Sequence, residues 1–123
     1  MTDTFGKEFG DSLKINKGLI KFNFYGNEMT DKTLEKIAEA INSSTLGLQE
    51  FNMGQNNLHD KGGVKLGEAL KKNECLTKIN LSDNNFTDET ALSINRHLLD
   101  NKMIDEVNLS KNLINIRVLE MVA

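Results

Sequence analysis

The sequence predicts an α/β solenoid with four parallel strands on its concave side and helices on its convex side. The first observation is a frame of apolar residues at offsets 0, 3, 5 and 10, with an asparagine at offset 8. The frame starts at Leu19, Leu48, Leu76 and Ile104, at intervals of 29, 28 and 28 residues. The second observation is a stretch of helical character after each frame. A fixed period of this length is typical of stacked repeats.

Length and composition indicate a single soluble domain over residues 1–123. The chain has 38% hydrophobic and 27% charged residues, which is an ordinary globular composition. No apolar run approaches the roughly 20 residues that span a bilayer, and no signal peptide is evident, so we expect a cytoplasmic protein without a membrane contact. The net charge of −3 is spread along the chain, which argues against nucleic-acid binding.

The chain opens on a helical half repeat over residues 1–18. Phe5, Phe9 and Leu13 recur at every fourth position and predict a helix with these residues facing inward. The first full repeat starts at residue 19 with a strand over 19–24. Thr30 or Asp31 then begins a helix, as capping residues do. Its predicted apolar face consists of Leu34, Ile37, Ala38 and Ile41.

The next two repeats start at residues 48 and 76 and follow the same plan. In the second repeat the helix covers residues 60–70, and small residues on it allow close packing on the sheet. In the third repeat it covers residues 88–98. The residues predicted to face inward are Gly63, Leu66, Gly67 and Leu70 in the second repeat and Ala91, Ile94 and Leu98 in the third.

The fourth repeat starts at residue 104 and is incomplete. Residues 113–123 are largely apolar, whereas the end of a solenoid normally carries a polar cap. We therefore expect either that the chain is a piece of a longer array or that residues 113–123 make an end-to-end contact with another chain. A short solenoid that tolerates an irregular end is the third alternative.

The asparagines at offset 8 are predicted to be structural. Asn27, Asn56, Asn84 and Asn112 follow the strands at the point where the chain leaves the sheet. A side-chain amide can both donate to and accept from nearby backbone groups. Stacked turns would then form an internal asparagine ladder.

The repeats resemble the ribonuclease-inhibitor-like class of leucine-rich repeats. The resemblance rests on the 28 or 29-residue period, the helix in each repeat and the stretch DKGGVKLGEAL at residues 60–70. It implies strands on a concave face that commonly binds proteins, there or along the rim. The class includes inhibitors, activators of Ran-type GTPases, tropomodulin-like actin-cappers, innate immune sensors and many cytoskeletal or ciliary proteins.

The outward strand positions form columns that we take as the candidate protein-binding face. One column is asparagine in every repeat, one alternates lysine and glutamate, and one begins with an aromatic anchor, Tyr25. The alternative is a solvated face whose charges pair across strands and whose asparagines bond to one another. The candidate residues are Lys21, Asn23, Tyr25, Glu50, Asn52, Lys78, Asn80, Ser82, Glu106 and Asn108.

The sequence offers no catalytic, metal or cofactor site. His59 and His97 are far apart in the repeat register and lack partners at ligand spacing. We therefore predict a protein that is not an enzyme and binds a protein partner, as a scaffold module of a larger cytoskeletal, ciliary or signalling protein. The alternative is a regulator of a small GTPase, since residues 79–86 are similar to repeats of Ran-type activators.

Overall fold

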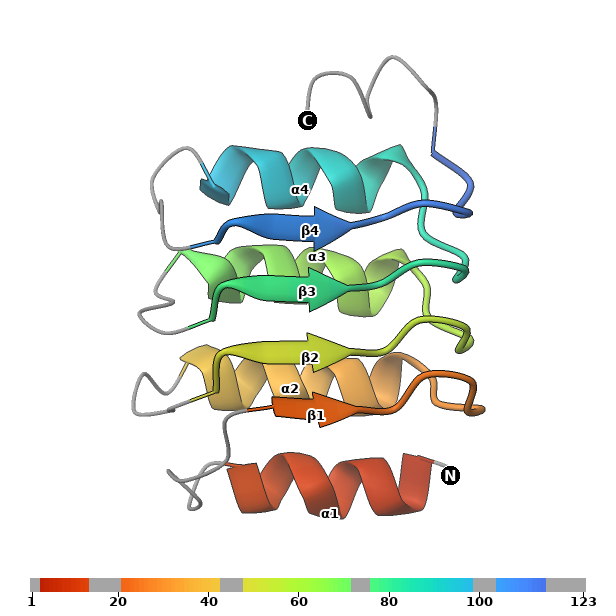
Figure 1. The fold of residues 1–123 in the computed structure, drawn as a ribbon, viewed down its shortest axis with the longest axis vertical. Coiled ribbons are helices and arrows are strands. Elements are labelled where there is room, and N and C mark those ends of the chain that lie inside the picture. Colours follow the sequence, from red (N-terminus) through yellow and green to blue (C-terminus); the bar gives the residue numbers. More distant parts are fainter. Residues whose placement is uncertain (1–2, 14–20, 43–47, 72–75, 99–103, 115–123) are drawn as a thin grey trace.

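The computed structural model describes residues 3–13, 21–42, 48–71, 76–98 and 104–114. In these ranges helices and strands alternate along the chain and stack in sequence order (Figure 1). The helices are α1 (Asp3–Leu13), α2 (Asp31–Asn42), α3 (Asp60–Leu70) and α4 (Asp88–Leu98). The strands are β1 (Lys21–Asn23), β2 (Glu50–Asn52), β3 (Lys78–Asn80) and β4 (Glu106–Asn108). None of these helices is long and apolar enough to cross a membrane.

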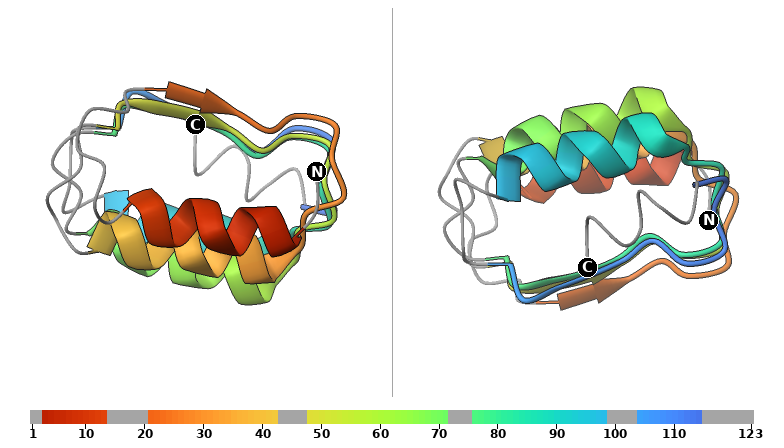
Figure 2. Two further views of the ribbon diagram at one scale, coloured as in Figure 1. Left: turned by 90° about the horizontal axis from the view of Figure 1, so that it is seen from below. Right: turned by 90° about the horizontal axis from the view of Figure 1, so that it is seen from above.

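The strands form one parallel sheet in the order β1-β2-β3-β4. The views along the stack show the strands in one layer and the helices in a second layer opposite (Figure 2). The register sets Phe22 beside Phe51 and Ile79 beside Val107, so equivalent positions of successive repeats are neighbours. This arrangement confirms the predicted α/β solenoid. Each strand has three residues and is shorter than the apolar frame around it, whose flanking residues, such as Leu48 and Met53, are also buried.

The apolar core lies between the two layers. The inward faces predicted for α2 and α3 are confirmed, and Ala91 and Ile94 of α4 are buried as well. Leu98 is only partly buried but packs against the core. Aromatic rings fill the space near β1, where Phe22 stacks on Phe51 with ring centroids 5.2 Å apart. Leu19 of the first frame and residues 115–123 lie outside the described residues.

The inward face predicted for α1 is partly wrong. Its buried residues are Gly6, Gly10 and Leu13, while Phe5 is 44% exposed. A Cβ atom at Gly6 would lie 2.0 Å from Thr33 Oγ1, so the glycine side of α1 sits directly against α2. This close approach turns Phe5 toward the edge of the core, where its ring still meets that of Phe24.

The asparagine ladder is present and confirms the structural role predicted for these residues. Nδ2 of Asn84 donates to the carbonyl oxygens of Leu81 and Ser82 in its own repeat and of Met53 in the preceding repeat, each at 3.1 Å. Its Oδ1 accepts hydrogen bonds from the backbone amides of residues 56 and 58. Asn56 and Asn112 bridge their repeats in the same way. The ladder therefore joins successive turns of the solenoid through buried polar bonds.

A second set of contacts, which the sequence did not predict, joins successive helix starts. Asp3 of α1 accepts hydrogen bonds from the backbone amide of Thr30 at 2.8 Å, from Thr30 Oγ1 at 2.5 Å and from Thr33 Oγ1 at 2.8 Å. We call such a set an Asp–Thr clamp. It ties the first turn of one helix to the start of the next.

The same clamp recurs between α3 and α4. Asp60 accepts from the backbone amide of Thr87 at 2.9 Å, from Thr87 Oγ1, and from Thr90 Oγ1 at 2.6 Å. Burial alone would raise the pKa of Asp3 and Asp60. The hydrogen bonds from the threonines outweigh burial and hold the pKa of both carboxyl groups below its ordinary value.

Replacing Asn84 should lower the free energy of unfolding strongly, because it removes a central residue of the ladder. Asn84→Ala leaves five backbone groups without their side-chain partner in a buried site, and we expect a loss of about 4 kcal/mol in the free energy of unfolding. Asn85→Ala is the matched control, because Asn85 makes an exposed side-chain bond to Asn57, and it should cost less than about 1 kcal/mol. Urea titration measures both. Equal costs for the two variants would contradict the structural role of the ladder.

Replacing Asp60 should give a pH-dependent loss of stability. A carboxyl with a lowered folded pKa stabilises the fold fully above its unfolded pKa of about 3.9, and this contribution is lost as the pH falls through the folded pKa. Asp60→Asn should therefore lower the free energy of unfolding by about 2 kcal/mol at pH 7, and the difference from wild type should shrink in acid below about pH 4.

Urea unfolding over this pH range measures the effect of Asp60→Asn. Asp105→Asn removes the same charge from an exposed aspartate and should leave stability within about 0.5 kcal/mol of wild type. A deficit in Asp60→Asn that stays constant down to pH 2 would show that the carboxylate charge is not what holds the clamp.

Candidate functional site

The outward side of the sheet carries a hollow of about 470 Å³. Eight of the ten predicted site residues line it, two from each strand. We call this set the strand-face groove: Lys21, Asn23, Glu50, Asn52, Lys78, Asn80, Glu106 and Asn108. Because the strands are parallel and in register, the groove consists of two straight rows of side chains that run across the sheet.

The asparagine row is held in place by the turns that follow the strands. Oδ1 of Asn23 accepts a hydrogen bond from the backbone amide two residues later, at 2.9 Å, and Asn52, Asn80 and Asn108 repeat this bond at 2.9 to 3.0 Å. The hydrogen bonds between these asparagines that the alternative of a solvated face included do not occur among the described residues. Each Oδ1 is therefore held by its own turn, and the Nδ2 groups form a row of donors with the spacing of parallel strands, about 4.8 Å.

Only some of the charges in the lysine–glutamate row pair with one another. The register sets Lys21 beside Glu50 and Lys78 beside Glu106. Lys21 Nζ and Glu50 Oε2 lie 3.6 Å apart, with the lysine side chain 65% exposed, so this pair contributes little to stability. Within the described ranges, Lys78 and Glu106 form no such ion pair and are both exposed.

The remaining two predicted residues, Tyr25 and Ser82, differ in how exposed their side chains are. Tyr25 is 48% exposed. Its ring lies against the backbone of Gly54, where a Cβ atom would come within 2.8 Å of Tyr25 Cδ2. Ser82, expected to face outward, is only 9% exposed and is adjacent to the same glycine. Ser82 therefore offers little contact surface, although it holds the same position in its repeat as Tyr25.

The described part of the chain shows no group of three or more histidine, cysteine or acidic residues that could hold a metal ion. His59 is exposed at the start of α3. His97 lies on α4, where its Nδ1 is 2.8 Å from the carbonyl oxygen of Ser93. His59 precedes α3 and His97 lies near the end of α4, so the two histidines are far apart in the repeat, as the register indicated.

Comparisons with known proteins agree with the architecture. The family model described as "Leucine Rich repeat" matches residues 48–67 and 72–94. No curated protein matches the chain. Many solved structures are similar, including the following two. The first, "Leiomodin-1 Actin-Binding Site 2", is 20% identical with a TM-score of 0.78, over 93% of this chain and 70% of that one. The second, the Caenorhabditis elegans tropomodulin C-terminal domain, is 15% identical with a TM-score of 0.79, over 95% and 72%.

These structural neighbours show the fold, which extends beyond the two repeats that the family model covers. Their likeness reaches nearly the whole of this chain. The observed strand, ladder asparagine and helix in each complete repeat correspond to the frame read from the sequence. Residues 48–67 and 72–94 match leucine-rich repeats, and the described residues fold as a leucine-rich-repeat solenoid.

Proposed function

We propose that this domain is a non-catalytic protein-binding module that takes its partner on the strand-face groove. The observation that carries the proposal is the asparagine row. Its four oxygens are bound to the turns, so the Nδ2 donors are fixed in orientation before a partner arrives. Donors that are already ordered lose less conformational entropy on binding.

The chemistry of the groove suits a polypeptide. The row of amide donors can pair with carbonyl or carboxylate oxygens of a partner. Lys78 and Glu106 add one charge of each sign, which favours a partner segment with mixed charges over a strongly acidic or basic one. Tyr25, near one end of the groove, supplies an aromatic surface of the kind that often dominates interface energies.

Actin is the first partner to test, and a cytoskeletal setting follows from that choice. The support is the name of one structural neighbour, the actin-binding site 2 of leiomodin-1. An identity of 20% supports the fold alone, so the choice of actin is part of the proposal. No comparison favours the alternative of a small-GTPase regulator.

The end of the solenoid is a second candidate contact surface for the same function. Leu113 is 69% exposed, which agrees with the expectation of an apolar contact over residues 113–123. Residues 115–123 lie outside the described part of the chain, and the support for this surface is the exposure of Leu113 and the apolar sequence that follows it. The groove has the stronger support, because both of its rows are defined by hydrogen bonds and register.

Binding should depend on the donor row and on Tyr25. Asn52→Asp with Asn80→Asp keeps the oxygen that each turn needs but removes the amide donors. We expect this double variant and Tyr25→Ala each to weaken binding to purified actin by about 30-fold, the effect of losing about 2 kcal/mol. Fluorescence anisotropy with actin monomers and co-sedimentation with filaments measure the affinity.

Asn57→Asp is the matched control for the double variant. Asn57 is exposed outside the groove and uses its Oδ1 as an acceptor for Asn85, so the Asn57→Asp domain should bind actin like wild type. Failure of the wild-type domain to bind monomers or filaments would exclude actin. Binding that survives in both groove variants would exclude the groove.

A further inference from the structure

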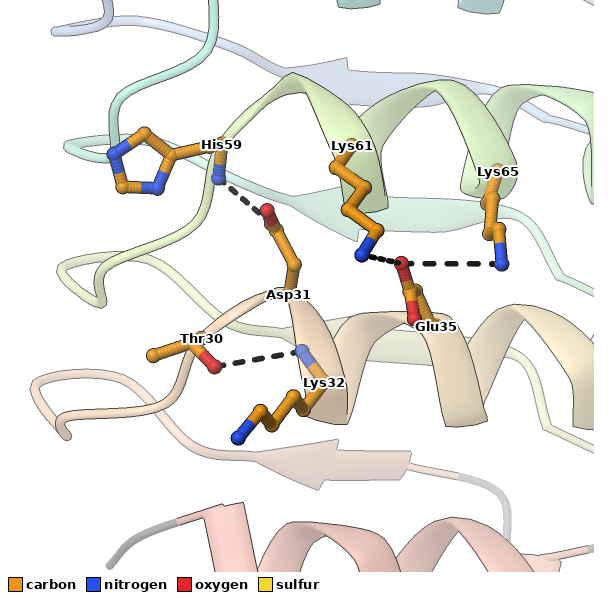
Figure 3. Close-up of polar contacts among 7 residues, drawn as sticks. All are labelled: Thr30, Asp31, Lys32, Glu35, His59, Lys61 and Lys65. Atoms are coloured by element: carbon orange, nitrogen blue, oxygen red, sulfur yellow. Dashed lines mark hydrogen bonds and ion pairs between the residues drawn. The ribbon is translucent and has the colours of Figure 1, made fainter.

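The junction between α2 and α3 lacks the Asp–Thr clamp that joins the helices on either side of it. His59 occupies the position of Thr30 and Thr87, and Gly62 occupies that of Thr33 and Thr90. Asp31 consequently receives a single hydrogen bond of this set, from the backbone amide of His59 at 2.8 Å. Figure 3 shows this contact, with the imidazole of His59 directed away from the carboxylate.

Ion pairs take the place of the clamp at this junction. Glu35 of α2 has lysines 61 and 65 of α3 beside its Oε1, at 4.0 Å and 3.8 Å (Figure 3). This Oε1 atom is buried and has no hydrogen-bond partner. The two lysine side chains are 77% and 52% exposed. The equivalent positions in the next two repeats carry Val64 and Leu92, so this glutamate contact does not recur at the α3–α4 junction. The α1–α2 junction has an ion pair between Asp11 and Lys36, but it has the clamp as well.

The strand side of the same junction is as regular as the others. Strands β2 and β3 pair in full register. Asn84 joins its own repeat to the preceding one through three bonds, to the carbonyl oxygen of Met53 and from the backbone amides of Asn56 and Leu58. The weakness is therefore confined to the helix side of the solenoid.

We propose that the α2–α3 junction is an electrostatic hinge, at which the helices part while the strands stay paired. Backbone hydrogen bonds fix the distance between strands at about 4.8 Å. Helix spacing is set by side chains and varies over about 8 to 10 Å. Widening the helix layer at one junction bends the strand layer more tightly and changes the shape of the groove. The hinge depends on the scaffold alone and does not require the groove to bind a protein.

Salt should loosen this hinge selectively. The screening length falls from about 10 Å at 0.1 M to about 3 Å at 1 M ionic strength. The exposed lysines at the α2–α3 junction are accessible to salt, and their separations from Glu35 exceed the screening length at 1 M. The clamps at the other two junctions are short hydrogen bonds and respond less.

Three equivalent backbone amides report on the three junctions in one experiment. The amides of Thr30, His59 and Thr87 each donate to the aspartate of the preceding helix. Amide hydrogen exchange followed by NMR gives the protection of each in the wild-type chain. We expect protection of the His59 amide to be about tenfold lower than that of the other two in 0.1 M NaCl, and to fall by about a further fivefold in 1 M NaCl.

Two variants assign the salt effect to Glu35. Glu35→Gln should lower protection of the His59 amide by about fivefold in 0.1 M NaCl and remove its salt dependence. Asp11→Asn is the matched control, because it removes the 3.6 Å ion pair with Lys36 at the α1–α2 junction, and it should leave His59 unchanged. Equal protection of the three wild-type amides at both salt concentrations would overturn the hinge, and so would a Glu35→Gln variant that exchanges like wild type.

Discussion

The asparagine ladder is the interaction on which the rest of this structure depends. Each ladder side chain holds the turn of its own repeat and bonds to backbone of the preceding one, as Asn84 does with Met53 and Leu58. No repeat can satisfy these groups alone. The cost of leaving buried backbone groups unpaired therefore makes the repeats interdependent. By fixing where the chain leaves the sheet, the ladder also fixes the strand register, and with it the straight rows of the groove.

Two rows of asparagines do different work in this chain, although they are only four residues apart in each repeat. Asn84 is buried with both ends of its amide bonded to backbone. Asn80 lies on the sheet surface, where only its oxygen is bonded. Residue type alone does not distinguish the ladder asparagines from the groove asparagines. Position in the repeat distinguishes them, because it determines whether an amide contacts the neighbouring repeat or lies on the open face of the sheet.

Periodicity made the fold, the strand register and eight of the ten groove-side residues predictable, since each depends on a spacing that recurs in the sequence. The burial of Ser82, the exposure of Phe5 and the Asp–Thr clamps were not predicted. They depend on how closely neighbouring helices approach and on where the chain turns. The clamps did leave a signal: Asp3 and Asp60 each precede threonines by 27 and 30 residues. This spacing joins residues of two successive repeats, so it is not visible in the pattern of a single repeat.

In this solenoid one asparagine row holds the repeats together, and the other is available to a partner. Hydrogen exchange of the side-chain amide groups, followed by NMR in the free domain, tests this division most directly. Nδ2 hydrogens of the buried Asn84, and of Asn56 beside it in the ladder, should exchange slowly. Those of Asn52 and Asn80 in the groove should exchange at nearly the rate of a free amide. Equal protection of the two rows would contradict this division.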